Sequence, residues 1–382
     1  MSNKPATVAQ PGTSLYGIAK LFFKLGVLGF GGPAVHIAMM EEEVVRKRAW
    51  MNHQHFLDLV GATNLIPGPN STEMTMHIGR ERAGWRGLVV AGCCFIFPAV
   101  LITALFAWAY QQYGHLPRVQ PFIYGIKPAI IAVIVVTMIS LGRKALKSVQ
   151  LVVIGLLSAL AALAGVNEII VLFGAGLTGV FLYVMQTAGK LTYGFFPFTL
   201  LQMAVAGFDG SAAKLFFVFL KVGSLLYGSG YVLFAFLDAE LVGRGWLTKQ
   251  QLVDAIAVGQ FTPGPVFSSA TFIGWQIGGA AGAVAATIGI FLPSFVFVAL
   301  LNPLIPKLRR SKIMGAFLDT VNVASIALIL AVLIEMSAET LLDWRTVLIA
   351  AASFGITFCF KKINTAFIVI GGAVLGYALS YV

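Results

Sequence analysis

The sequence predicts an all-α polytopic membrane protein with about ten transmembrane helices plus two re-entrant Pro/Gly hairpins, arranged as an inverted structural repeat. The first observation is composition: 58% of the 382 residues are hydrophobic and 11% are charged, whereas a soluble domain carries about 25% charged residues. The second is that apolar runs of about 18 residues or more, enough to cross a bilayer, recur along the chain. The third is an internal duplication. Little sequence is left for a soluble domain.

The net charge of +11 is explained by membrane topology. Lysines and arginines lie in short clusters between apolar runs, as in membrane-flanking loops, so a nucleic-acid partner is not indicated. Cys93, Cys94 and Cys359 lie in apolar segments without metal-ligand spacing, so no metal or cofactor is expected. The apolar run after the polar N-terminal tail contains Lys24 and no small-residue cleavage site, so we expect it to remain as the first helix.

The duplication covers nearly the whole chain. Residues of the first half recur in the same order in the second: Glu43 and Glu240, Trp50 and Trp246, Asp58 and Asp254, Pro98 and Pro293, and Pro67-Gly68-Pro69 and Pro263-Gly264-Pro265. A repeat of this length predicts two related modules. We expect a polar tail over 1–14, a first membrane repeat over 15–190, a connecting loop over 191–212 and a second, inverted repeat over 213–382.

Each repeat is expected to hold one long helix, one segment interrupted by proline and glycine, and further helices. In the first repeat these elements span about 15–39, 55–78, 87–110, 121–142, 149–165 and 168–187. In the second they span about 213–237, 251–276, 282–301, 315–337, 345–360 and 364–381.

The basic residues indicate how the interrupted segments lie, because cytoplasmic loops are enriched in lysine and arginine. If both segments dip into the membrane and return, the basic clusters at 46–48, 80–86, 143–147 and 307–312 all lie in the cytoplasm. Full crossings would divide the basic residues more evenly. Each repeat then crosses an odd number of times, so the second enters the membrane inverted, as in many secondary transporters.

Lys24 and Lys221 occupy matching positions well inside the first predicted helix of each repeat. A charge at such a depth costs at least about 2.5 kcal/mol on insertion scales, so each lysine needs a partner or a polar cavity. One interpretation is that both face an anion pathway. The alternative is that each extends to the headgroups or pairs with an acid.

A glycine-rich break follows each of these lysines. Gly31 and Gly32 precede Pro33 in the first repeat, and Gly228 and Ser229 stand at the matching place in the second. Glycines let backbone amides face a cavity, and the positive end of a half-helix attracts anions. The breaks therefore predict an anion site, with a packing kink as the alternative.

The densest polar stretch inside an apolar region runs from Asn64 to Glu73. It predicts the tip of a re-entrant hairpin, because non-helical backbone at membrane depth must be lined by protein or water. Asp58 and Asp254 are expected to fix the bases of the two hairpins. The candidate anion-binding side chains are those of Asn64, Asn70, Ser71 and Thr72 and, in the second repeat, Gln260, Thr262 and Ser268.

Glu73 is the candidate proton-coupling residue, because desolvation of a buried carboxylate favours its neutral form. The structural alternative is that Asn70 and Glu73 form a variant capping box. Ser269 stands opposite Glu73 in the second repeat, so we expect any proton coupling in the first. His36 and His77 lie near the breaks and can titrate near neutral pH, although lining helix ends is the commoner role.

With these motifs the chain resembles a two-domain, long-chain member of the chromate ion transporter family. The resemblance rests on the lysine and glycine-proline break over 24–33, the charged run 41–48 before Trp50, and the tip 64–70, with weaker copies over 221–265. It implies export of chromate across the inner membrane, giving chromate resistance, driven by the membrane potential, the proton gradient or both. Sulfate, a similar dianion, is the natural competitor, and oxyanion uptake, exchange or an anion channel stays an alternative.

The expected partners are a chromate or sulfate anion, protons and membrane lipid. A homodimer is common among such transporters and stays open. The sequence contains no nucleophile and base pair, metal-ligand cluster or cofactor fingerprint at usable spacing. An enzyme is therefore not predicted.

Overall fold

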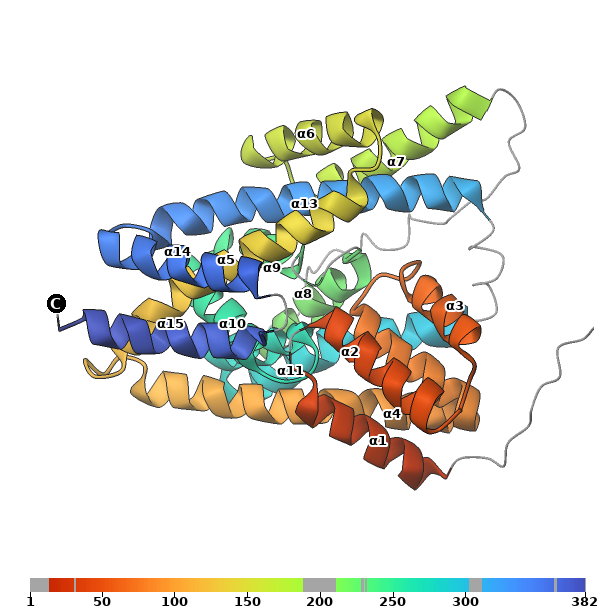
Figure 1. Ribbon diagram of the computed structural model, residues 1–382, viewed down its shortest axis with the longest axis horizontal. Helices are drawn as coiled ribbons and strands as arrows, with labels where there is room; N and C mark the ends of the chain where they lie inside the picture. Colours follow the sequence, from red (N-terminus) through yellow and green to blue (C-terminus); the bar gives the residue numbers. More distant parts are fainter. Residues whose placement is uncertain are drawn as a thin grey trace, which may run out of the picture.

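The computed structural model describes residues 14–30, 32–187, 211–227, 230, 232–301, 311–360 and 363–381, whose arrangement is shown in Figure 1. Nearly all of the predicted tail and most of the predicted connecting loop lie outside these residues. So do three candidate site residues, Gly31, Gly228 and Ser229. Every regular element within the described ranges is a helix.

The first half begins with α1 (Leu15–Leu28) and α2 (Pro33–Met40), and α2 continues as a short π-helix, η1 (Glu41–Lys47). α3 (His53–Thr63) and the long α4 (Asn70–Tyr113) follow, separated by the polar stretch predicted as a hairpin tip. The half ends with α5 (Gln120–Ala145), α6 (Val149–Leu163) and α7 (Glu168–Thr187).

The second half has the same order of elements. It begins with α8 (Ser211–Leu225), α9 (Val232–Leu237) and the π-helix η3 (Asp238–Val242). The next elements are α10 (Lys249–Phe261), the 3-10 turn η4 (Val266–Ser268), α11 (Ser269–Leu301), α13 (Lys312–Thr340), α14 (Trp344–Cys359) and α15 (Thr365–Leu379). Several helices begin at side chains that accept a backbone N–H: Ser14, Asn52, Ser148, Thr248, Ser311, Asp343 and Asn364.

Five segments within the described residues are long and apolar enough to cross a membrane: Asn70–Tyr113, Gln120–Ala145, Glu168–Thr187, Val266–Leu300 and Lys312–Thr340. Large apolar side chains on them are exposed, such as Leu105 in α4 at 61% and Leu177 in α7 at 66%. Such surfaces suit lipid better than water. The chain is therefore a polytopic, all-helical membrane protein.

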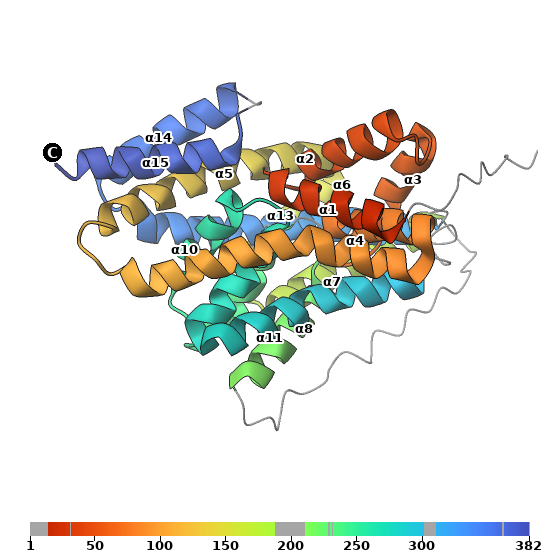
Figure 2. The same ribbon diagram turned by 90° about the horizontal axis from the view of Figure 1, so that it is seen from below.

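α4 and α11 each reverse direction inside what is otherwise continuous helix. In α4, Ala83 and Gly84 leave helical geometry, Gly84 with φ +59°, and a Cβ added at Gly79 would overlap the carbonyl oxygen of Gly87. The short arm of α4 (residues 70–82) therefore packs directly against its long arm (residues 85–113), as Figure 2 shows at one end of α4. The same pattern in α11 uses Gly278 and Gly279 at the reversal and a Gly274–Gly282 contact between arms 269–277 and 280–301.

The helix predicted over 15–39 is divided at its predicted glycine-proline break, but the prediction that it crosses the membrane as one long element is wrong. α1 and α2 are separate helices, and the chain folds back between them, so that Lys24 Nζ lies 2.9 Å from Glu43 Oε1 on η1. In a straight helix these residues would be about 28 Å apart. Gly32, at φ +83°, permits the reversal, and Pro33 begins the new helix.

The second half repeats this early reversal. α8 and α9 replace the single helix predicted over 213–237, and Lys221 Nζ on α8 lies 2.6 Å from Glu240 Oε1 on η3. The first predicted helix of each half therefore folds back on itself and does not form one continuous crossing helix.

The long arms of α4 and α11 pack side by side and run in opposite directions. Arg80, near the reversal of α4, donates to Val298 O at 3.0 Å and Ala299 O at 2.6 Å, near the end of α11. Gln276, near the reversal of α11, donates to Ala107 O at 3.1 Å, near the end of α4. Each reversal thus lies beside the far end of the other long arm.

Candidate functional site

The tips of the two interrupted segments each contact the opposite half. Gly68 in the first tip donates its backbone N–H to Leu226 O at 2.8 Å, just after α8. Gly264 in the second tip donates to Gly29 O at 2.7 Å, just after α1. Both tip glycines have left-handed φ values, +136° and +89°, which would strain any other residue. One region built from both halves therefore contains the two tips and the two helix breaks.

The first tip gathers the predicted polar residues, but not as a capping box. α4 begins at Asn70 without a side-chain cap, and Asn70 Nδ2 instead donates to Asn64 Oδ1 at 2.7 Å. Asn64 is exposed, whereas Ser71 and Thr72 are buried. The capping interpretation of Asn70 and Glu73 is therefore wrong.

Glu73 is fully buried in the short arm of α4, with an exposed fraction of 0%. Neither of its carboxyl oxygens has a hydrogen bond of ordinary geometry among the described residues. The polar group that it faces is Ser294 Oγ on the long arm of α11, because a Cβ added at Gly68 would overlap both side chains. The carboxyl group thus lies at a contact between the first tip and the second half.

The second tip has a similar backbone and different chemistry. Ser269 stands where Glu73 stands in the first half, and its hydroxyl donates to Val266 O at 2.9 Å. Ala99 on α4 supplies the contact with Gly264, since a Cβ on that glycine would lie 2.8 Å from the Ala99 Cβ. The buried acid therefore belongs to one half alone.

The other candidates in the second tip are already engaged. Gln260 is buried, and Thr262 Oγ1 donates to Val258 O at 2.6 Å. Ser268 Oγ accepts a hydrogen bond from Thr103 Oγ1 at 3.2 Å. Because Thr103 is on the long arm of α4, Ser268 joins the two halves.

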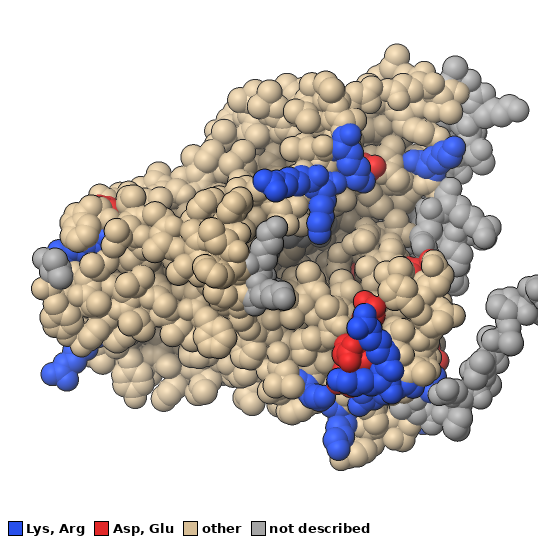
Figure 3. Space-filling view, viewed as in Figure 1, with Lys and Arg blue, Asp and Glu red and all other residues tan. Residues whose placement is uncertain are grey.

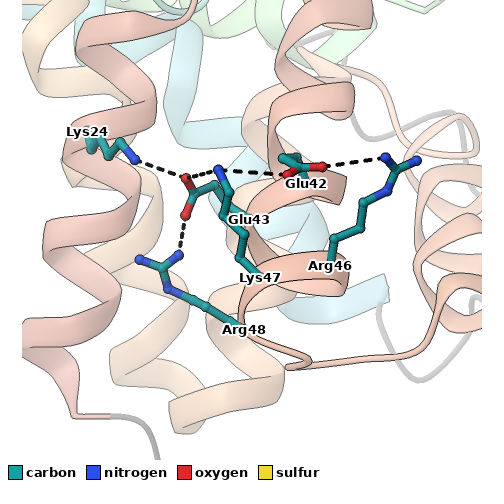
Figure 4. Close-up of polar contacts among 6 residues, drawn as sticks. All are labelled: Lys24, Glu42, Glu43, Arg46, Lys47 and Arg48. Atoms are coloured by element: carbon teal, nitrogen blue, oxygen red, sulfur yellow. Dashed lines mark hydrogen bonds and ion pairs between the residues drawn. The ribbon is translucent and has the colours of Figure 1, made fainter.

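Lys24 pairs with an acid, the alternative that the sequence left open. Figure 4 shows Glu43 between Lys24, at 2.9 Å, and Arg48, with Lys47 Nζ 3.4 Å away. Burial raises the pKa of Glu43, but the hydrogen bonds and positive charges of Lys24 and Arg48 outweigh it and lower the pKa to about 2. Glu43 is therefore ionised at neutral pH and joins α1 to η1.

The second half contains the same arrangement. Glu240 accepts from Lys221 at 2.6 Å and from Arg244 at 2.7 Å. In the first half, the lysine also borders a hollow of about 540 Å³ whose polar lining includes Glu42 and Lys47. The two lysines thus have counter-ions, and Lys24, half exposed, still faces open space.

A buried ion pair that was not predicted from the sequence joins α5 to α10. Lys127 in α5 is 7% exposed, and its Nζ lies 3.2 Å from Asp254 Oδ1 on α10. Tyr110 Oη donates to Asp254 Oδ2 at 2.6 Å. These contacts tie α10 to α4 and α5. The available signal was a lone lysine inside the apolar run predicted over 121–142.

The two histidines differ in environment. His36 Nε2 lies 2.8 Å from Gly29 O, so this side chain bridges the α1–α2 break, with its ring edge-on to Phe95 at 5.3 Å. His77 is fully buried in the short arm of α4. The predicted role of lining a helix end therefore describes the position of His36 but not that of His77.

Charged side chains are sparse on the face shown in Figure 3, where they gather in groups on either side of a hollow. One group lies over α2 and η1, and the other over the junction of α5 and α6. The group at the α5–α6 junction contains Arg143 and Lys144 in the last turn of α5, and Lys147, which pairs with Asp319 at 3.0 Å. Cations therefore lie near this hollow on both sides.

The sequence profile of a family described as chromate transporter matches residues 16–180 and again residues 213–377. The chain belongs to the chromate transporter family. It is 28% identical over 376 residues to a chromate transport protein of Cupriavidus metallidurans, covering 96% of this chain and 93% of the relative. It is 30% identical over 375 residues to a chromate transport protein of Pseudomonas aeruginosa, covering 93% and 90%. No solved structure matches the chain.

A probable chromate transport protein of Synechococcus elongatus is 27% identical over 377 residues, covering 96% of both chains. The family profile matches the segment containing α1 to most of α7 and then the segment containing α8 to most of α15. Both matched segments of this multi-pass membrane protein therefore contribute to the region that contains the two tips and the two breaks.

Proposed function

We propose that this protein exports chromate from the cytoplasm across the inner membrane, driven by the membrane potential, the proton gradient or both. The observation that carries the proposal is the family match over both halves, whose tips and breaks meet in one region. Relatives of nearly equal length are named chromate transport proteins. An inside-negative potential favours expulsion of a dianion by about 4.6 kcal/mol per 100 mV when two charges cross.

The proposal includes two inverted membrane repeats, over 15–190 and 213–382, each with a re-entrant hairpin. The antiparallel long arms support it. So does the contact of His55 Nε2 with Glu81 Oε1 at 2.7 Å, which brings the start of α3 and the end of the short arm of α4 to the same side. Because the first predicted helix of each half folds back, the number of membrane crossings no longer supports the inversion. The support comes instead from these contacts.

The substrate site proposed here lies between the two tips and the two breaks. Backbone amides, hydroxyls and side-chain amides would replace the water around the dianion, with lysines attracting it from either side. The contributing residues are Lys24, Gly31, Gly32, Asn64, Asn70, Ser71, Thr72, Lys221, Gly228, Ser229, Gln260, Thr262 and Ser268.

Glu73 is the proposed proton-binding residue of the cycle. It is buried at the contact between the first tip and Ser294 of the second half. If alternating access moves one half against the other, as in other inverted-repeat transporters, that contact opens and closes during each cycle. The carboxyl group would then exchange a proton when the contact is open.

The test is anion flux in inverted vesicles, with the pH gradient and the membrane potential imposed separately. Chromate accumulation under at least one gradient is expected, with sulfate competing. Absence of chromate flux under both gradients would overturn the proposal. Sulfate flux without chromate flux would instead assign the protein to another oxyanion. An anion current that neither gradient converts into accumulation would indicate a channel.

A further inference from the structure

The short arm of α4 presents titratable and charged side chains that the short arm of α11 does not. Glu73, His77 and Arg80 are spaced at i, i+4 and i+7, so they lie along one face of the helix. The matching residues in α11 are Ser269, Ile273 and Gln276. The duplication therefore shows which of these side chains the hairpin itself does not require.

His77 is the unexplained member of this row. It is 0% exposed, and neither ring nitrogen has a hydrogen-bond partner among the described residues. A buried polar group left unpaired loses its hydrogen bonds to water without replacing them, which destabilises the fold. Ile273 fills the equivalent place in the second half at no such cost, so packing alone does not account for a histidine here.

The row leads from the buried carboxyl group to the base of the hairpin. Glu73 lies next to the tip and faces Ser294, whereas His77 lies one turn, or about 6 Å, further along the helix. Arg80 follows near the reversal and is held by carbonyls of α11. Beyond it, Glu81 is exposed at the base. His77 is thus the titratable side chain between Glu73 and the base on this face.

Few other groups on the neighbouring elements can titrate near this row. α11 contacts the row near the end of its long arm, at Ser294, Val298 and Ala299, and its residues 269–301 contain no acidic, basic, tyrosine or cysteine side chain. Tyr227, between α8 and α9, lies within electrostatic range of Glu73, and Arg80 within range of His77. The remaining titratable groups on the helices packed against α4 are Tyr16, Lys20 and Lys24 on α1, His36 on α2, His53, His55 and Asp58 on α3, and Lys249 and Asp254 on α10.

We propose that His77 relays protons between the Glu73 carboxyl group and the base of the first hairpin. A neutral imidazole has one acceptor and one donor nitrogen. The proton that leaves Glu73 binds the acceptor nitrogen, and the other nitrogen releases its own proton toward the base, so the ring returns to neutral with its tautomer exchanged. This inference rests on the proposed role of Glu73 and adds the route by which its proton leaves.

The experiment follows protonation of Glu73 directly and uses no chromate. Purified protein in liposomes receives a rapid pH jump, and infrared spectroscopy records the growth of the carboxylic acid C=O band that is missing in Glu73→Gln. We expect His77→Ile to slow this growth at least about tenfold, because a positioned proton-transfer group contributes a factor of this order or more. His77→Gln should slow it similarly, and Ile273→His should leave it unchanged.

An unchanged rate in both His77 variants, each with wild-type thermal unfolding, would overturn the relay. So would the absence of any titrating band assignable to Glu73. If one variant fails to fold, the other decides. The flux assay in inverted vesicles is separate: a wild-type protein that moves no chromate but shows the His77-dependent rate would refute the proposed substrate and leave the relay standing.

Discussion

At the residue scale, the duplication supplies an internal comparison for each charged side chain. Both halves keep a glutamate between a lysine and an arginine, Glu43 in the first and Glu240 in the second. Only the first half has a buried acid at its tip. The glutamates present in both halves, Glu43 and Glu240, join the two helices of each early fold-back. Glu73, present in the first half alone, is the better candidate for driving the transport cycle.

Replacing Glu43 with Gln should lower the free energy of unfolding at neutral pH by about 1.5–3 kcal/mol, because a charge-assisted contact is lost. The pKa of Glu43 falls from 4.5 to about 2 on folding, so its contribution is complete above about pH 4.5 and disappears as pH falls toward about 2. Thermal unfolding of both proteins in detergent, measured across this range, checks the prediction. A difference that stays constant down to low pH would contradict it.

Removing one partner of the Lys127–Asp254 pair should be costly. Lys127→Met leaves a buried carboxylate uncompensated, so we expect a loss of about 3–5 kcal/mol, and Lys127→Met with Asp254→Leu should recover most of it. Thermal unfolding in detergent gives the double-mutant cycle. Lys147→Met is the matched control, because its pair with Asp319 is exposed and worth at most about 1 kcal/mol. Equal losses in both pairs would show that water reaches the Lys127–Asp254 pair as freely as it reaches the exposed one.

Glu73→Gln should separate the two driving forces. Chromate flux driven by a pH gradient is expected to disappear, because the amide binds no proton, while flux driven by the membrane potential should remain. Ser269→Ala, at the matching position of the second half, is the control and should change neither. Vesicle flux under separate gradients is the measurement, and undiminished pH-driven flux in Glu73→Gln would remove this residue from the coupling mechanism.

At the element scale, glycines decide where helices turn back. The arms of α4 meet at Gly79 and Gly87, and those of α11 at Gly274 and Gly282, each pair in backbone contact. Gly84 and Gly279, both at φ +59°, make the reversals. The short arms can therefore lie close enough to bury the residues that they present.

Gly79→Ala should push the two arms of α4 apart. The added Cβ would overlap backbone rather than a flexible side chain, so we expect a loss of about 1–3 kcal/mol. Gly174→Ala in α7 is the control: no atom lies within 4 Å of its added Cβ, and it should be neutral or slightly stabilising in a helix. Thermal unfolding of the two variants gives the comparison, and equal stability would show that the arms can separate freely.

Helix boundaries were predictable where glycine and charged residues interrupt an apolar run. The separate segments predicted over 55–78 and 87–110 correspond to the two sides of the reversal in α4. The fold-back after α1 was not predictable from composition, because a glycine-proline break is compatible with either a kink or a reversal. The φ of Gly32 and the pairing of Lys24 with Glu43 distinguish the two.

At the scale of the whole molecule, the proposed inversion predicts that the bases of the two hairpins face opposite sides of the membrane. In a background without the native cysteines, Arg86→Cys marks the base of the first hairpin and Gln250→Cys that of the second, both at exposed positions. In inverted vesicles, a membrane-impermeant thiol reagent should label the cysteine at 86 at once. The cysteine at 250 should react only after permeabilisation, and labelling of both from one side would contradict the inversion.

The sequence by itself determined the class of protein, the duplication and the polar positions of the tips, because composition, order and periodicity are local properties of the chain. It also identified Glu73 as the acid without a counterpart. Only the tertiary structure decided which groups meet: Glu73 with Ser294, Lys127 with Asp254, and each tip glycine with the opposite half. These partners are far apart in sequence, and contacts at such separations depend on how the helices pack, which no local pattern encodes.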